Sequence, residues 1–269
     1  MQRALARQKA ALEQAGLPPC ADAAGARERL RVLVRTHFDV LLGPGLNIKR
    51  SPLGGRNFEY FSEDPYLSGK LAAGYVRGIQ STGVAATPKH YAANSQETRR
   101  MASDSVVDER TLREIYLTGF EIAVREAHPR ALMSSYNLVN GTYANENEHL
   151  LTEILRQEWG FDGLVVTDWG GGNDPVAGAA AGSSIEMPSP GLEPVRLLAT
   201  AVANGTLSRA ALDARAGEVL AMARSTSPSV TEFNVQEHNE LARRAAEQSM
   251  VLLRNEGALL PLRPGTKVA

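Results

Sequence analysis

The feature of this sequence that most constrains its fold is an alternation of short apolar runs with longer amphipathic segments. The apolar runs lie at residues 39–43, 84–90, 131–137 and 163–168, and a shorter one lies at 184–188. They lack strict every-second-residue alternation and end in polar residues, which is typical of strands buried on both faces. Such strands separated by helices predict the α/β class, with a parallel sheet wrapped by helices. Periodicity alone leaves open whether the sheet closes into a (β/α) barrel or stays open and doubly wound.

The helices between the runs have recognisable ends. Asp64-Pro65 and Asp174-Pro175 each place a capping aspartate before a proline suited to the first helical turn. Gly83 is expected to end the first helix and Asp108 to begin the second. Further helices are expected over 151–159, 206–222 and 238–250, with a polar linker over 225–231 and a new strand beginning at 267–269.

Composition excludes several classes of protein. Among 269 residues, 43% are hydrophobic and 22% are charged, which is ordinary for a soluble globular protein. The net charge of −1 argues against nucleic acid or an anionic membrane as a partner. Cys20 is the one cysteine, which excludes an intramolecular disulfide and a thiolate metal site. No apolar stretch is long enough for a membrane span.

The start of the chain bears on its compartment. The first residues, MQRALARQK, are basic but are not followed by the apolar stretch of a secretory signal. We therefore expect a cytoplasmic protein, or a secreted or periplasmic one if the true N-terminus lies upstream. The sequence does not indicate an oligomeric state.

Polar side chains follow four of the apolar runs, where parallel strands end and where ligands bind in such folds. They are Arg56 and Glu59 after the first run, Lys89 and His90 at the second, Tyr136 after the third, and Asp168 and Trp169 after the fourth. Lysine, arginine and histidine can donate to hydroxyl groups, an indole can stack on a sugar, and an ionised carboxylate can attack an electron-poor carbon. Each residue also has an ordinary structural interpretation, but four coinciding strand ends favour a pocket for a neutral, polyhydroxylated ligand.

Two weaker patterns point to no site. Glu146 and His149 have the spacing of some metal ligands but stand alone in a polar loop. Gly170-Gly171-Gly172 follows a strand, yet it lacks the remaining residues of a phosphate-binding motif. We therefore expect no metal.

Longer motifs carry a resemblance to a known family. They are LLGPGLNIKRSPLGGRNFEYFSEDP over 41–65, KHYAAN over 89–94 with QETRR over 96–100, YNLVNG over 136–141 and WGFDGLVVTDWG over 159–170. In order and spacing they resemble glycoside hydrolase family 3, the family of β-glucosidases and β-xylosidases, from about Phe38 onward.

The resemblance implies a domain organisation. It implies a (β/α) TIM-like barrel, incomplete at the N-terminus, with only the start of a following α/β sandwich domain. The expected parts are a non-matching segment over 1–37, the catalytic barrel over 38–224, a linker and helix over 225–250, and the beginning of a truncated sandwich domain over 251–269.

The resemblance also implies roles for the candidate residues. Asp168 matches the family's nucleophile, and Glu59 is expected to orient Arg56 or Lys89. The residues expected to contact the carbohydrate substrate are Arg56, Lys89, His90, Tyr136 and Trp169. The implied reaction is retaining hydrolysis of a terminal β-D-glucosyl or β-xylosyl residue through a covalent glycosyl-enzyme on Asp168, without a cofactor.

Two departures from the family bear on this expectation. The family's acid/base carboxyl comes from its second domain, and no residue of this chain matches it, so activity is expected to be weak or absent. Ser184 stands where the family usually has an aspartate. Two other hypotheses therefore stay open: a non-catalytic, truncated remnant that binds sugar, and an aldolase that forms a Schiff base on Lys89.

Overall fold

The computed structural model describes residues 40–227 and 234–267. Its internal contacts divide the chain into two units, residues 1–228 and 229–269. The expected non-matching segment over 1–37, residues 228–231 of the expected linker and the last two residues of the expected strand at 267–269 lie outside the described residues.

Short parallel strands form the centre of the first unit. Strand β1 (Val40–Leu41) pairs with β2 (Ala85–Ala86), and β4 (Ala131–Met133) pairs with β7 (Leu164–Val166). A bridge between Tyr91 and Ser134 joins the two pairs, and a bridge from Val166 to Ile185 adds the fifth expected run. The α/β alternation expected from the sequence is therefore confirmed, and the five strand positions follow one another in chain order.

The short strands β2, β4 and β7 are buried in the core of the first unit. Ala85, Ala86, Ala131, Leu132 and Val165 are fully buried. Such strands carry small or branched apolar side chains and give way to polar residues where they leave the core. The functional candidates follow at these points.

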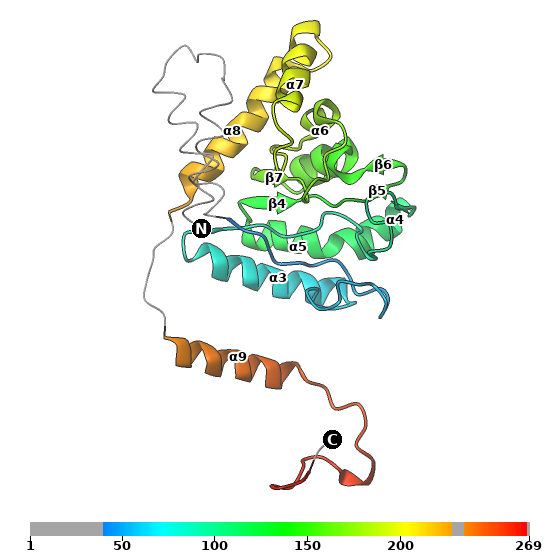
Figure 1. Ribbon diagram of the computed structural model, residues 1–269, viewed down its shortest axis with the longest axis vertical. Helices are drawn as coiled ribbons and strands as arrows, with labels where there is room; N and C mark the ends of the chain where they lie inside the picture. The colour runs from blue at the N-terminus through cyan, green and yellow to red at the C-terminus, as the bar shows by residue number, and fades with distance from the viewer. Residues whose placement is uncertain (1–39, 228–233, 268–269) are drawn as a thin grey trace. The chain divides into compact units, whose positions relative to one another are not determined.

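Helices α3 (Pro65–Gln80) and α5 (Thr118–Ala127) run side by side along one side of the strands (Figure 1). Asp64 caps α3 as expected, since its carboxylate accepts a hydrogen bond from the Leu67 amide at 3.0 Å. The helix ends at Gln80, three residues before Gly83. Two glycines allow close contact, because a Cβ on Gly69 would lie 3.1 Å from the Cα of Gly119.

The second expected helix, after Asp108, is one helical stretch with a wider turn in its middle. It comprises α4 (Glu109–Thr111), the π-helical η1 (Leu112–Leu117) and α5. Its apolar side chains pack into the main core, where the rings of Phe120 and Trp159 both contact Tyr91 edge-on. The core thus contains Tyr91, in the segment that follows β2 and carries His90.

The remaining helices of the first unit include one that the sequence did not predict. The expected helices at 151–159 and after Asp174 are η3 (His149–Glu158) and α6 (Pro175–Ala181), and the one at 206–222 is α8 (Arg209–Ser225). Helix α7 (Glu193–Asn204) was not predicted. In Figure 1, α6 and α7 lie on the opposite side of β4 and β7 from α3 and α5.

A small sheet and three further helices complete the described elements. The sheet joins β3 (Asp104–Ser105), β5 (Leu138–Val139) and β6 (Thr142–Tyr143). Short 3₁₀ turns are η2 (Ala144–Glu146) and η4 (Glu256–Ala258), and the second unit contains α9 (Val235–Ser249), close to the helix expected at 238–250. In the described part of the chain, no helix combines the length and apolar character needed to cross a bilayer.

Candidate active site

The ends of the parallel strands bring the candidate residues together. The His90 ring, at the end of β2, lies with Nε2 3.4 Å from Oδ2 of Asp168, which follows β7. The same nitrogen lies 3.3 Å from Nη1 of Arg56, which comes from the loop after β1. Three segments far apart in sequence therefore meet at one point.

Asp168 has two differently placed carboxylate oxygens. Oδ1 accepts a hydrogen bond from the Trp169 amide at 2.7 Å. Oδ2 is buried and has no hydrogen-bond partner among the described residues. The residue is 7% exposed, and burial raises the pKa of its carboxyl above the usual value. One oxygen is thus held by the backbone, while the other has no hydrogen-bond partner among the described residues.

His90 is neutral in this setting. It is 1% exposed, and burial lowers the pKa of its ring to about 2, with the nearby charges of Arg56, Lys89 and Arg100 acting in the same direction. The contact between His90 and Asp168 is therefore not an ion pair, although the two groups lie within ion-pair distance.

Charged side chains form a chain of contacts beside this centre. Glu59 binds Arg56 at 2.6 Å and lies 3.3 Å from the Lys89 ammonium, so it contacts both of the residues that it was expected to orient. Glu97 binds Arg56 at 2.8 Å and Arg100 at 2.5 Å. With Asp168 included, three cations face three carboxylates among the described residues of this cluster. Such a balance suits a neutral ligand.

Two aromatic side chains border Asp168. The Tyr136 hydroxyl donates to the Trp169 carbonyl at 2.8 Å, and the Arg100 guanidinium lies 4.5 Å from the centre of the Tyr136 ring. Burial and the charge of Asp168 raise the pKa of Tyr136. Trp169 is 41% exposed, so its indole is accessible at the edge of the site.

Sequence reasoning assigned no role to four residues of this cluster. Glu97 and Arg100 lie in the QETRR motif, so their pattern was visible without its function. Tyr60 and Asn47 gave no separate signal; the Tyr60 hydroxyl lies 3.0 Å from Nδ1 of His90 and 3.3 Å from Nδ2 of Asn47.

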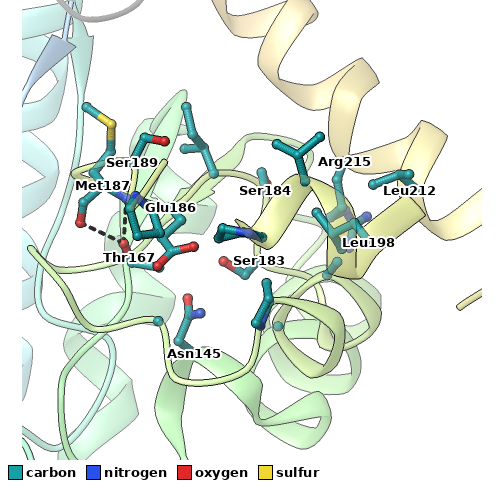
Figure 2. A pocket seen from close by; sticks show the side chains of 18 of the residues that line it. Asn145, Thr167, Ser183, Ser184, Glu186, Met187, Ser189, Leu198, Leu212 and Arg215 are labelled. Carbon is teal, nitrogen blue, oxygen red and sulfur yellow. Dashed lines mark hydrogen bonds between the residues drawn. The ribbon is translucent and has the colours of Figure 1, made fainter. Parts of the chain in front are cut away.

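A cavity of about 310 Å³ lies between the strand end at Ile185 and helices α6, α7 and α8 (Figure 2). Asp168, His90 and Arg56 do not line it. Thr167 exchanges hydrogen bonds with the backbone of Met187 at its edge, at 2.9 and 3.2 Å. Burial raises the pKa of Glu186, which also lines it. Thr167, which directly precedes Asp168, is among the residues that line this cavity.

The two weaker sequence patterns have structural partners. Glu146 accepts hydrogen bonds from the Asn173 and Asp174 amides at 3.1 and 2.7 Å, which ties down the loop after Asp168. His149 contacts Glu153 on its own helix, η3, and Glu109 on α4. Their spacing thus reflects loop and helix packing.

Comparison with known proteins gives one family match. The model of the glycosyl hydrolase family 3 N terminal domain matches residues 11–222, and the match begins inside the segment over 1–37. The chain is 52% identical over 236 residues to the thermostable β-glucosidase B of Acetivibrio thermocellus, covering 87% of this chain and 31% of that protein. It is 46% identical to an exo-α-(1→6)-L-arabinopyranosidase of Bifidobacterium longum, covering 84% of this chain and 30% of that protein.

A solved structure has a similar fold. β-Glucosidase 3B from Thermotoga neapolitana in complex with glucose superposes with a TM-score of 0.77 at 44% identity, covering 82% of this chain and 33% of that one. The chain thus spans about a third of the length of the relatives it matches.

Proposed function

This chain belongs to glycosyl hydrolase family 3, and from that premise we propose that it supplies the sugar-binding and nucleophilic half of a retaining β-glycosidase. The substrates are glycosides with a terminal β-D-glucosyl or β-xylosyl residue. The observation that carries the proposal is Oδ2 of Asp168, which is buried beside Arg56 and His90 and has no hydrogen-bond partner among the described residues. The β-glucosidases among the relatives support the substrate class.

The proposed reaction has two steps. In the first, Asp168 Oδ2 forms a bond to C1 of the sugar while the bond from C1 to the leaving oxygen breaks and a general acid protonates that oxygen. In the second, water attacks C1, the ester bond to Asp168 breaks, and the same group takes the proton from the water. Two inversions retain the configuration at C1.

The surrounding side chains hold the sugar in this proposal. Arg56 and Lys89 donate to its hydroxyl groups, held in place by Glu59. Trp169 and Tyr136 border C1 and the leaving group. Because three cations balance three carboxylates, the site accepts a neutral sugar without a net desolvated charge.

The general acid lies outside the described residues in this proposal. Glu59 and Glu97 both accept hydrogen bonds from Arg56. Both carboxylates therefore act as acceptors toward a guanidinium, which is not the role of a general acid. A family 3 second domain is the expected source of the acid, so unactivated glycosides should react slowly with this chain alone.

The strand order supports a (β/α) barrel for the first unit. The described strand positions run β1, β2, β4, β7 and Ile185 in chain order. A doubly wound sheet reverses its order at a switch point, whereas a barrel continues until the last strand meets the first. We assign the catalytic barrel to residues 38–224 and the start of the sandwich domain to 251–269.

Covalent labelling tests the proposed nucleophile. The reagent is 2-deoxy-2-fluoro-β-D-glucosyl fluoride, whose fluoride leaves without protonation, so that labelling does not depend on a general acid. We expect one label per chain, located on Asp168 by peptide mass mapping, and no label on Asp168→Asn. The matched control is Asp162→Asn, an exposed aspartate in the same motif, which should be labelled like the original chain.

Two outcomes contradict the proposal. Label on another residue with Asp168 unmodified removes the nucleophile assignment. Saturable glucose binding by calorimetry without any label favours the non-catalytic sugar-binding alternative.

A further inference from the structure

The ring of His90 lies between groups whose hydrogen-bonding roles are fixed. Nε2 faces Arg56 Nη1 at 3.3 Å and Asp168 Oδ2 at 3.4 Å, and Nδ1 faces the Tyr60 hydroxyl at 3.0 Å. A neutral imidazole carries one proton, so one ring nitrogen donates and the other accepts. The partners therefore decide which nitrogen is protonated.

The Tyr60 hydroxyl is placed to accept from His90. Asn47 Nδ2 donates to the His90 carbonyl at 2.8 Å, which turns the amide so that this NH₂ group also faces the Tyr60 oxygen at 3.3 Å. The Asn94 carbonyl, a pure acceptor, lies 3.4 Å from the same oxygen and takes the Tyr60 proton. The oxygen lone pairs are then left to accept, one from Asn47 and the other from Nδ1–H of His90.

The contacts of Nε2, on the other side of the His90 ring, agree with a proton on Nδ1. A guanidinium can only donate, so Arg56 needs an acceptor at Nε2. A proton on Nε2 would face the Arg56 N–H and would leave the Asn94 carbonyl without the Tyr60 proton. With the proton on Nδ1, both ring nitrogens and the Tyr60 hydroxyl have matching partners, and Asp168 Oδ2 has no hydrogen-bond partner among the described residues.

We propose that Tyr60, held by Asn47, is a positioning residue that keeps the proton of His90 on Nδ1 and thereby keeps Asp168 Oδ2 free of a hydrogen bond. This inference rests on the proposed function of Asp168 as nucleophile. A hydrogen bond from Nε2–H would occupy one of the two lone-pair sites of Oδ2 and draw electron density from the oxygen that must form the bond to C1. This assignment also reverses the role that the sequence analysis expected for His90. A histidine that donates to a sugar hydroxyl was expected there, whereas Nε2 of His90 accepts a hydrogen bond in this assignment.

The tautomer can be read directly by NMR. The 269-residue chain is labelled with ¹⁵N-histidine, and the two ring nitrogens of His90 are identified by comparison with His90→Gln. Protonated and unprotonated imidazole nitrogens have widely separated ¹⁵N shifts. We expect the Nδ1–H form of His90 in the original chain and the Nε2–H form in Tyr60→Phe.

The kinetic consequence is measured with the same fluoro-sugar reagent. In Tyr60→Phe the rate constant for labelling Asp168 should fall about tenfold or more, the scale set by one hydrogen bond to a charged group. The matched control is Tyr91→Phe, which also removes a buried hydroxyl, one that donates to the Leu150 carbonyl at 3.0 Å. It should keep both the His90 tautomer and the labelling rate.

The outcomes separate this inference from the proposed function. An Nε2–H tautomer in the original chain, or an unchanged tautomer in Tyr60→Phe, overturns the inference even if Asp168 is labelled. Failure to label Asp168 with the expected tautomer present overturns the proposed function instead. The spectrum of the original chain decides the tautomer even if Tyr60→Phe does not fold.

Discussion

At the scale of single residues, the buried carboxylate of Asp168 lowers the free energy of unfolding, and the rest of the fold must offset this loss. The carboxylate is nearly buried, and within the described part of the chain one of its two oxygens is hydrogen-bonded while the other is not. Active sites commonly hold such unfavourable groups, and replacing them often stabilises a protein while removing its activity. The isolation of Oδ2 therefore predicts a measurable effect on stability.

We expect Asp168→Asn to raise the free energy of unfolding at neutral pH by roughly 1 kcal/mol. Burial raises the pKa of Asp168 in the folded state above its unfolded value, so ionisation destabilises the fold at any pH above both values. As the pH falls through the folded-state pKa, the carboxyl is protonated and the advantage of asparagine should shrink. Urea unfolding followed by circular dichroism at neutral and acidic pH measures this, and an equal or lower stability of the variant at neutral pH contradicts it.

The sequence pattern singled out candidate residues but not the connections between them. Asp168, Lys89 and His90 became candidates because each lies within four residues of the end of a buried strand, and the strand pattern is local. Tyr60 and Asn47 were not, because their effect depends on hydrogen bonds across 30 and 43 residues to His90. Donor and acceptor roles of this kind are set by side-chain positions that a linear pattern does not contain.

At the scale of elements, Ser184 joins the last strand position to two helices. Its hydroxyl donates to Glu218 of α8 at 2.5 Å and accepts from the Val165 amide at 2.9 Å. Glu218 also binds Arg156 of η3 at 3.0 Å and Arg215 at 2.6 Å. The position that departs from the family is therefore part of the packing between strand and helices.

Ser184→Ala should lower the free energy of unfolding by about 1 to 3 kcal/mol, because it leaves the buried Val165 amide without this acceptor and weakens the contact to Glu218. Thermal or urea unfolding of the chain measures the change. The control is Ser81→Ala, since the exposed Ser81 hydroxyl bonds only to the Gly78 carbonyl at the end of α3. Equal stability losses in the two variants would argue against a structural role for the Ser184 contacts.

Helix prediction succeeded where capping residues were explicit. Asp64-Pro65 and Asp174-Pro175 both begin helices, as expected. Helix α7 was missed because Pro190, Gly191 and Pro194 resemble loop residues, while Pro194 in fact occupies the first turn, where proline is tolerated. Its N-cap residue makes no side-chain hydrogen bond, so the usual start signal is absent.

At the scale of the whole molecule, sequence periodicity identified an α/β arrangement but not its closure. The order of the strands became visible only through their pairing, which the apolar runs do not encode. Family motifs appeared from about Phe38 onward, whereas the family match begins at residue 11. Motifs concentrate where chemistry constrains the residues, so they mark strand ends more sharply than domain limits.

The stability of the whole fold should also depend on pH, because the titratable side chain of His149 connects two segments that are far apart in sequence. Its ring contacts Glu153 of η3 at 2.5 Å and Glu109 of α4 at 3.1 Å, and these carboxylates raise its pKa, mainly through the hydrogen bond to Glu153. A raised folded-state pKa stabilises the fold below the unfolded value near 6.5, and this stabilisation is lost as the pH rises through the folded value.

We therefore expect His149→Gln to lower the free energy of unfolding in mild acid by a few tenths of a kcal/mol, since the ion pairs are partly exposed and screened. The two proteins should converge above the folded-state pKa of His149. Urea unfolding across this pH range, repeated with Glu153→Gln in both backgrounds, measures the coupling. A coupling of equal size at high and low pH would contradict the assignment.

The even match of cations and carboxylates around Asp168 has a consequence for the lifetime of an ester on that residue. Esterification removes one negative charge, and Arg56, Lys89 and Arg100 then face only Glu59 and Glu97. In the proposed reaction, the site would therefore carry a net positive charge for as long as the sugar stays attached, which would draw electron-rich attackers toward C1. Release of the sugar would restore neutrality, so the charge of the site would alternate with each proposed catalytic cycle.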